Sequence, residues 1–163
     1  MDLATRTGHA HYEPEVVLRQ HRGNRAVSWE ETFVSEMRVL IVDDEDDMRA
    51  LVRATIEIAN EGLRVTGEAS DGDAAVTILR EERPEVVVLD HRMPGISGLE
   101  TARRILSEHP DQAIVLFSSY LDRDVQLTAE RLGVRVCLAK DDIRQLPDAI
   151  WSTELPPARG GAA

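Results

Sequence analysis

Short apolar runs recur along the chain and predict five β-strands. Each run is rich in valine, isoleucine or leucine and is bounded by charged or turn-forming residues, as is typical of buried strands. The runs lie at residues 39–42, 63–69, 86–89, 113–117 and 134–138. Because these strands are apolar on both sides, we expect a parallel sheet with helices packed on both of its faces.

The segments between the apolar runs predict five helices, because apolar residues recur in them every three or four positions. These segments are residues 46–59, 72–82, 98–108, 122–132 and 142–151. Several carry end signals: Asp71 is a suitable N-cap for the second helix, prolines follow the second and third helices, and Gly133 can close the fourth in a left-handed conformation. The last helix contains Pro147, which either interrupts it or starts it.

Strand and helix alternate five times, and this alternation predicts a doubly wound α/β fold. We expect a parallel five-stranded sheet of the flavodoxin-like (βα)5 kind, with strand order 2-1-3-4-5. Folds of this kind bind ligands at the carboxyl ends of the strands, close to the point where the strand order reverses. The residues directly after the first and third strands are therefore the first candidates for a functional site.

The two ends of the chain differ in composition from the alternating region. Residues 1–36 show scattered charges and no sustained apolar period, and we expect them to be mostly disordered. One domain is predicted over residues 37–150, and residues 151–163, rich in proline and glycine, are expected to form a flexible tail. Met37 is also a candidate translation start; otherwise the first 36 residues would be a tether or docking arm.

Composition narrows the classes of function. The 163 residues include 30 acidic and 19 basic ones, for a formal net charge of −11, which disfavours direct binding to nucleic acids and to anionic membrane surfaces. The apolar runs stay far below the roughly 20 residues that a membrane-spanning helix needs. The single cysteine, Cys137, cannot form an intramolecular disulfide, so we expect a cytoplasmic protein.

Three aspartates stand at the ends of two strands that are expected to be neighbours. Asp43 and Asp44 follow the first strand directly, and Asp90 follows the third. If these carboxylates converge they need a counter-ion, and Mg²⁺ is the natural one because it takes oxygen ligands and also binds phosphate oxygens. The alternative is that the acidic run at residues 43–47 only forms a solvated turn and caps the first helix.

Two further strand ends supply polar groups to the same edge. Lys140 follows the fifth strand and is the one lysine among nineteen basic residues, all the others being arginine. A compact ammonium group suits contact with a phosphoryl oxygen, the alternative being a chance surface lysine. Ser118 ends the fourth strand and offers a hydroxyl donor. Together these residues predict a phosphoryl-transfer site in which Asp90 is the nucleophile.

Three segments resemble the signature of response regulator receiver domains in two-component signalling. They are VLIVDDEDDMR at residues 39–49, LDHRMPGISGLE at residues 89–100 and VCLAK at residues 136–140. The resemblance implies a CheY-like switch that takes a phosphoryl group from a sensor histidine kinase on Asp90, with Mg²⁺ as cofactor. The site roles that it implies are metal ligation by Asp43, Asp44, Asp90 and the backbone carbonyl of Arg92, and contact with the phosphoryl group by Ser118 and Lys140.

The chain departs from the family pattern at two positions. Receiver domains often carry an aromatic residue three positions before the lysine, where it moves together with the switch hydroxyl; here that position is Cys137. Tyr120 is a candidate substitute, the alternative being a plain surface tyrosine. The proline that usually follows the lysine is replaced by Asp141, a variation that resembles some DNA-binding regulators.

The output of the predicted switch depends on the length of chain after the last helix. The remaining residues are too few for a DNA-binding domain, so we expect a stand-alone regulator that is not a turnover enzyme. It would signal by conformational change to an effector protein or to a second copy of itself. The alternatives are a phosphorelay intermediate and a truncated receiver of a DNA-binding transcriptional regulator.

Two other classes of protein share parts of this pattern. A Mg²⁺-dependent phosphatase of the haloacid dehalogenase type needs a second aspartate-type acid two residues after its nucleophile. At that distance Asp43 is followed by Glu45 and Asp90 by Arg92, so general acid chemistry has poor support. A flavodoxin-like cofactor binder needs a phosphate loop of small residues after the first strand, where this chain has five acids that would repel phosphate. Both classes are therefore disfavoured.

Overall fold

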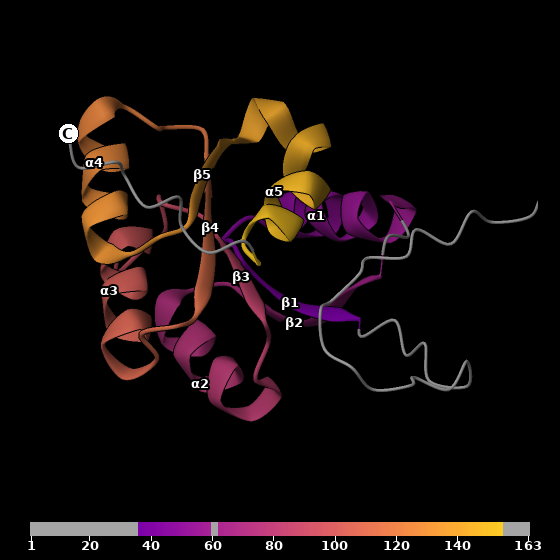
Figure 1. The fold of residues 1–163 in the computed structure, drawn as a ribbon, viewed down its shortest axis with the longest axis horizontal. Helices are drawn as coiled ribbons and strands as arrows, with labels where there is room; N and C mark the ends of the chain where they lie inside the picture. Colours follow the sequence, from indigo (N-terminus) through magenta and orange to yellow (C-terminus); the bar gives the residue numbers. More distant parts are fainter. Residues whose placement is uncertain (1–35, 60–61, 155–163) are drawn as a thin grey trace, which may run out of the picture. The chain divides into compact units, whose positions relative to one another are not determined.

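The computed structural model describes residues 36–59 and 62–154, in which strands and helices alternate along the chain (Figure 1). The strands are β1 Met37–Val42, β2 Leu63–Ala69, β3 Val86–Leu89, β4 Ala113–Ser118 and β5 Val136–Ala139. The helices are α1 Asp46–Ala59, α2 Gly72–Glu82, α3 Gly98–Glu108, α4 Arg123–Leu132 and α5 Leu146–Ser152, with a 3₁₀ helix, Lys140–Gln145, before the last. The predicted alternation of strand and helix is confirmed.

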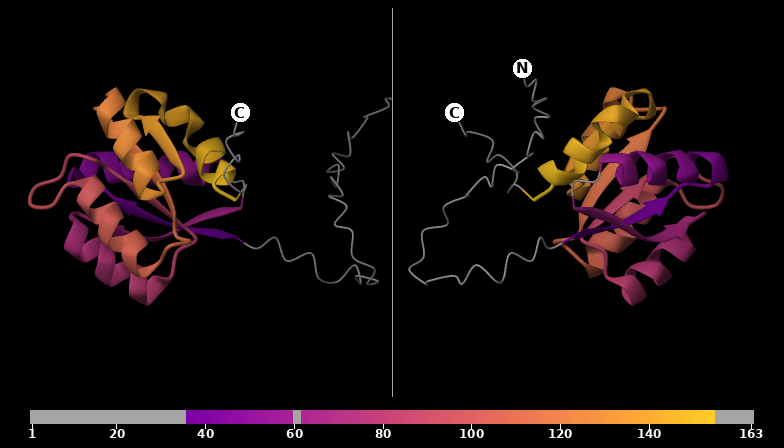
Figure 2. Two further views of the ribbon diagram at one scale, coloured as in Figure 1. Left: turned by 60° about the vertical axis from the view of Figure 1, so that its left-hand side comes forward. Right: turned by 90° about the vertical axis from the view of Figure 1, so that its right-hand side faces the viewer.

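All five strands pair in parallel in the order β2-β1-β3-β4-β5, which confirms the flavodoxin-like fold predicted from the sequence. Helices α1 and α5 cover one face of the sheet, and α2, α3 and α4 cover the other (Figure 1, Figure 2). Because β1 lies between β2 and β3, the winding reverses beside β1, and the carboxyl ends of β1 and β3 are neighbours.

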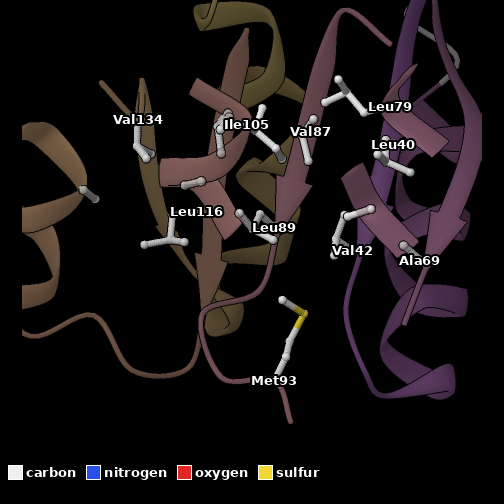
Figure 3. Close-up of a cluster of buried hydrophobic side chains, with 14 residues drawn as sticks. Leu40, Val42, Ala69, Leu79, Val87, Leu89, Met93, Ile105, Leu116 and Val134 are labelled. Carbon is white, nitrogen blue, oxygen red and sulfur yellow. The ribbon is translucent and has the colours of Figure 1, made fainter. Parts of the chain in front are cut away.

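Strand side chains alternate between two buried clusters, one on each face of the sheet. In β1, Leu40 and Val42 belong to the cluster beneath α2, α3 and α4, whereas Ile41 belongs to the cluster beneath α1 and α5. Figure 3 shows the first cluster, with side chains from β1, β3 and β4 gathered between the strands and the helices. Burial of these apolar side chains fixes the register of the strands and so the positions of the residues that come after them.

Side-chain caps set the start of three helices. The backbone N–H of Ala74 donates to Asp71 Oδ1 at 2.8 Å at the start of α2, which confirms Asp71 as the N-cap. Ser97 and Asp122 cap α3 and α4 in the same way. Gly133, after α4, has a φ of 96°, the left-handed conformation predicted for it. Local sequence therefore determines where these helices start and stop.

Several boundaries shift slightly from the prediction. β1 begins at Met37 instead of residue 39, and β4 and β5 each end one residue later than predicted, at Ser118 and Ala139.

Two further shifts have local causes. Asp122, predicted as the first residue of α4, is its N-cap, so the helix begins at Arg123. The backbone N–H of Val134 donates to Ala129 O at 3.0 Å and stays with the end of α4, so β5 begins at Val136 instead of residue 134.

The C-terminal region differs more from its prediction. The sequence predicts one helix over residues 142–151, whereas the structure has a 3₁₀ helix followed by α5 from Leu146 to Ser152. Pro147 gives the physical reason, because it lies in the first turn of α5, where its missing N–H breaks no helical hydrogen bond. α5 continues two residues beyond residue 150, and Thr153 after it is buried.

Some predictions concern residues that the structure does not describe. The disorder predicted for residues 1–36 lies outside the described residues except for Glu36, and the predicted tail is described only as far as residue 154. Over the described ranges, no helix combines the length and the apolar character needed to cross a membrane.

Candidate functional site

Three aspartates meet at the carboxyl edge of the sheet. β1 and β3 pair side by side up to Val42 and Leu89, and the backbone N–H of Asp90 donates to Val42 O at 2.8 Å. One carboxylate oxygen each from Asp43, Asp44 and Asp90 lies within 4.8 Å of the other two. Strand pairing therefore brings together acids that are far apart in the sequence.

Lys140 joins this cluster from the end of β5. Its Nζ atom lies 2.7 Å from Asp43 Oδ2 and 3.2 Å from Asp90 Oδ2. The side chains of Lys140, Asp43 and Asp90 are 7%, 3% and 5% exposed, so water screens these ion pairs far less than pairs at the surface. The one lysine of the chain is thus a buried partner of two site acids and not an ordinary surface residue.

Burial and charge shift the pKa values of two of these groups. Burial is the largest influence on Asp90 and raises the pKa of its carboxyl group; the charge of Lys140 opposes this shift and that of Asp43 adds to it. At Lys140, burial acts to lower the pKa, but the hydrogen bond to Asp43 and the charge of Asp90 outweigh it, and the pKa is raised. Lys140 therefore stays a cation, and Asp90 is more basic than an exposed aspartate.

The acidic cluster has the charge and the donor atoms that suit a divalent cation. Three ionised carboxylates and one ammonium group leave two negative charges in a small volume. Carboxylate oxygens are the hard ligands that Mg²⁺ and Ca²⁺ prefer. In the part of the chain that the structure describes, no hydrogen bond or ion pair reaches the Asp44 carboxylate, so its oxygens can take a ligand. The residues present therefore fit a divalent metal ion.

A hollow of about 180 Å³ opens beside the cluster. It is lined by Asp90, Ser118 and Lys140 together with Glu45, Arg92, Ser119 and Tyr120. Ser118 ends β4 and is buried, and its Oγ atom accepts a hydrogen bond from the backbone N–H of Tyr120 at 3.2 Å. No described residue accepts the hydroxyl proton of Ser118, so that proton can bond a group that enters the hollow.

Arg92 and Tyr120 form one wall of this hollow. The guanidinium carbon of Arg92 lies 3.4 Å from the centre of the Tyr120 ring, which is a cation–π contact. The sequence points to the backbone carbonyl of Arg92 and to Tyr120 separately, but it does not predict this contact between their side chains. One sequence signal could have indicated this contact. Arg92 lies two positions after Asp90 and Tyr120 lies two positions after Ser118, and these two site residues stand at the ends of the neighbouring strands β3 and β4.

Two glycines shape the loop that carries Asp90. Gly95 adopts a φ of 82° in the turn after Pro94, a conformation that favours glycine. The backbone N–H of Gly98, at the start of α3, donates to His91 O at 2.8 Å. A Cβ atom at Gly98 would overlap the backbone carbonyl oxygen of Asp90, so α3 can approach the loop this closely only with glycine there. Sequence reasoning missed Gly98, whose only signal is a glycine at the first position of a predicted helix.

Cys137 occupies the position where the resemblance leads one to expect an aromatic residue. Its side chain is half-buried and packs against the hydrophobic cluster beneath α2, α3 and α4. Burial raises the pKa of its thiol, and the charge of Glu130 adds to this shift. The thiol therefore stays protonated and packs as a small apolar group.

Arg49 is a second residue near the site that the sequence analysis did not single out. It lies in the first turn of α1, its side chain is 14% exposed, and its Nη1 atom donates to the backbone carbonyl of Asp43 at 2.6 Å. From the sequence alone, an arginine at the acidic start of a helix indicates only that it forms an ordinary surface ion pair. Only the folded structure shows that it bonds the backbone of a site residue.

Comparison with known proteins points to one family. The family described as response regulator receiver domain matches residues 39–151, a range that contains every site residue described above. The chain is 45% identical over 84 residues to protein-glutamate methylesterase/protein-glutamine glutaminase 3 of Hahella chejuensis. It is 44% identical over 80 residues to response regulator GacA of Pseudomonas viridiflava.

These matches cover 52% and 48% of this chain but only 24% and 36% of the relatives, so the chain spans well under half the length of either. Among solved structures, a two-component response regulator of the LuxR family from Aurantimonas sp. SI85-9A1 is 31% identical, with a TM-score of 0.68. That match covers 71% of this chain and 82% of the other.

Proposed function

The chain belongs to the response regulator receiver domain family, and from this premise we propose that it is a Mg²⁺-dependent phosphorylation switch with Asp90 as the phosphoryl acceptor. The observation that carries the proposal is the meeting of Lys140 with the three aspartates at one edge of the sheet. A nucleophile and a fixed positive charge thus face the same hollow, and the three carboxylates that could hold a metal ion meet beside it.

The proposed reaction needs mainly positioning and neutralisation of charge. A carboxylate oxygen of Asp90 attacks the phosphorus atom of a phosphohistidine on a sensor histidine kinase. The new P–O bond gives an acyl phosphate, and the P–N bond breaks with its electron pair on the imidazole, which takes a proton from water. Because Lys140 already contacts Asp90 Oδ2, its ammonium group can neutralise negative charge on the phosphoryl oxygens.

Mg²⁺ is part of this proposal, since the donor set fits it. The groups that would hold the ion are the carboxylates of Asp43, Asp44 and Asp90 and the backbone carbonyl of Arg92. When bound, the ion supplies positive charge that offsets the charges of the carboxylates and the phosphoryl group. Asp43 is held in place by Lys140 and by the backbone N–H of Glu45, which donates to Asp43 Oδ1 at 2.9 Å.

Ser118 is proposed to report the state of Asp90. Its Oγ atom now accepts a hydrogen bond from the backbone N–H of Tyr120, while no acceptor among the described residues takes its own proton. Phosphoryl oxygens on Asp90 would be charged acceptors, which bind a hydroxyl donor more strongly than neutral ones do. A turn of Ser118 toward them would loosen the bond to Tyr120 and shift the loop before α4, so α4 and β5 are the proposed response elements.

The proposed output is contact with an effector protein or with a second copy of the chain. The relatives bear names as different as a methylesterase and a LuxR-family response regulator, which supports a common receiver with varied outputs. The formal charge of −11 favours protein partners over direct nucleic acid contact. There are two alternatives: the chain passes the phosphoryl group on in a phosphorelay, or it is the receiver of a DNA-binding regulator. A cytoplasmic location is also part of the proposal.

Intact-mass measurement with acetyl phosphate tests the proposed acceptor. We expect one added phosphoryl group that requires Mg²⁺, is released by hydroxylamine as an acyl phosphate, and is absent from Asp90→Asn. Asp73→Asn changes an exposed aspartate on α2 and is the matched control that should still be phosphorylated. An adduct that persists in Asp90→Asn would reveal a different acceptor, and steady phosphate release without an adduct would indicate a phosphatase.

A further inference from the structure

We propose that Arg49 is a positioning residue for the Mg²⁺ site, and that it acts by fixing the backbone of the acidic turn between β1 and α1. This inference rests on the proposed function, because it concerns the affinity of the site for the ion. Arg49 donates none of its hydrogen bonds to the carboxylates of Asp43, Asp44 or Asp90, so its effect is transmitted through the backbone.

Arg49 ties three elements together from a largely buried position. Its Nη1 atom donates to the backbone carbonyl of Asp43 at 2.6 Å, its Nη2 atom pairs with Asp46 in the first turn of α1, and its Nε atom lies 3.4 Å from Glu68 Oε2 on β2. The planar guanidinium group presents its donors in a fixed fork, which a single ammonium group cannot reproduce. The end of β1, the start of α1 and β2 are thus held by one side chain.

The Asp43 carbonyl matters because it belongs to the peptide that links Asp43 to Asp44. The backbone N–H of Asp43 donates to Ala69 O at 3.1 Å, and the N–H of Glu45 donates to Asp43 Oδ1. Those two bonds hold the peptide groups on either side, and the hydrogen bond from Arg49 to the carbonyl restrains the Asp43–Asp44 peptide group itself. The direction of the Asp44 side chain depends on that plane.

Asp44 depends on this restraint more than the other two acids do. Asp43 and Asp90 are each held through their carboxylates by Lys140, whereas no described side chain or backbone group bonds the Asp44 carboxylate. Mutual repulsion among the acids at residues 43–47 also favours opening of the turn. Arg49 therefore keeps a loosely held ligand aimed at the metal position.

Arg53 is the matched control that the chain itself provides. It lies one turn further along α1 and pairs with the same Glu68, with Nε 2.7 Å from Oε1, and also with Glu57. Within the described part of the chain, Arg53 forms no hydrogen bond or ion pair with residues 43–47. Loss of Arg53 thus removes a similar charge from the same helix and leaves the turn untouched.

Charge and position predict opposite signs for the loss of Arg49. If its positive charge were what mattered, its removal would strengthen the binding of a cation nearby. If it positions Asp44, its removal weakens binding, as loss of outer residues that orient metal ligands typically does by tenfold or more. The direction of the change in Mg²⁺ affinity therefore separates the two roles.

The experiment is titration of the metal-free full chain with Mg²⁺ by calorimetry, together with thermal unfolding of each variant. We expect Arg49→Gln to weaken Mg²⁺ binding about tenfold, Arg49→Lys to weaken it about threefold, and Arg53→Gln to stay within about twofold of the wild type. Phosphorylation by acetyl phosphate should need correspondingly more Mg²⁺ in Arg49→Gln, while the rate at saturating Mg²⁺ recovers to within about twofold.

The outcomes separate this inference from the proposed function. Arg49→Gln that binds Mg²⁺ as tightly as Arg53→Gln, or more tightly, overturns the positioning role while the phosphorylation switch stands. A wild-type chain that does not bind Mg²⁺ overturns both. Should Arg49→Gln fail to fold, Arg49→Lys decides the matter, because wild-type affinity with the charge kept and the fork lost contradicts the positioning role.

Discussion

Helices α3 and α4 cover the same face of the sheet and each follows a strand end of the site, yet they are packed very differently. α3 follows Asp90 and buries four residues, namely Gly98, Thr101, Ala102 and Ile105. α4 follows Ser118, is nearly as long, and buries only Ala129 among its residues. Both helices stand on the same side of the sheet in Figure 1. Side chains on the acceptor side are thus fixed, and those on the hydroxyl side have little buried surface to lose.

The difference in packing suits the loop that carries Asp90 and the helix that follows Ser118 to different tasks. A nucleophile that must meet a phosphoryl group benefits from a rigid loop, since small misplacements slow the reaction strongly. An element that must change position benefits from few buried contacts, because regions with little apolar burial open at a low cost in free energy. The packing therefore supports a division between a fixed acceptor and a movable reporter.

The largest expected effect comes from a change at the first residue of α3, with the first residue of α4 as its comparison. Gly98→Ala would place a methyl group on the Asp90 carbonyl, and we expect a loss of about 4 kcal/mol in the free energy of unfolding together with at least tenfold slower phosphorylation. Arg123→Ala, at the same position of α4, should stay within about 0.5 kcal/mol. Urea unfolding and acetyl phosphate kinetics measure both. Equal effects at the two positions would remove the contrast between the helices.

A smaller effect is expected from truncation of one apolar side chain in each helix. Ile105 in α3 is 2% exposed, and Ile105→Ala should lower the free energy of unfolding by about 3 kcal/mol. Val125 in α4 is only partly buried, and Val125→Ala should cost about 1 kcal/mol. Amide hydrogen exchange should show faster opening in α4 than in α3 of the wild type. Similar protection of both helices would contradict the proposed division.

The buried charge of Asp90 should lower the free energy of unfolding in a pH-dependent way. The pKa of Asp90 is raised in the folded state, chiefly by burial, so its favourable contribution to stability is present below its ordinary value of 3.8 and is lost as the pH rises through the folded value. We therefore expect Asp90→Asn to be more stable than the wild type at pH 7, by about 1 kcal/mol. The difference should vanish as the pH falls toward 3.8.

Chemical unfolding across this pH range gives the measurement. Lys140 does not disturb it, because the pKa of its amine is raised from an ordinary value of 10.5 and the group stays charged throughout. Asp73→Asn, at an exposed side chain, should shift stability by less than about 0.5 kcal/mol at every pH. A less stable Asp90→Asn at pH 7 would mean that Lys140 outweighs burial at this carboxyl group.

The smallest expected effect concerns the cation–π contact between Arg92, after Asp90, and Tyr120, after Ser118. Tyr120→Leu removes the cation–π contact with Arg92 and admits more water to the hollow, so the phosphoryl group on Asp90 should decay about two to three times faster. Tyr120→Phe keeps the ring and should decay at the wild-type rate. Loss of phosphoryl mass after removal of the donor measures both. Equal lifetimes in all three proteins would show that the stack does not shield the site.

Much of the fold is predictable from the sequence because local signals agree with the tertiary structure. β2, α2, β3 and α3 have their predicted ends, since caps and prolines bound them, with Asp71 and Ser97 as caps and Pro84 and Pro110 as stops. The 3₁₀ helix after Lys140 is different. Its residues and those of α5 follow one apolar pattern in the sequence, in which Pro147 is compatible with either an interruption or a start of the helix; the structure shows that it lies at the start of α5.

The candidate site is predictable where it depends on strand ends and hidden where it depends on side-chain direction. Strand order alone places Asp43 and Asp90 side by side and brings Lys140 to their edge. The stack of Arg92 on Tyr120 and the bond from Arg49 to a backbone carbonyl need the positions of long side chains, which sequence spacing does not fix. Long, flexible residues are thus the part of a site that sequence reasoning finds last.

Lys140 is the one lysine in 163 residues, and its side chain is 7% exposed. Its amine can therefore serve as a native chemical probe of the site. Amine-reactive acylating reagents meet a single ε-amino group, apart from the α-amino group at the start of the chain. The rate at which that one amine is acylated measures how often the ion pairs around it separate. Peptide mass spectrometry can follow this acylation and so measure how often the site opens in the unmodified protein, with no engineered fluorophore or spin label.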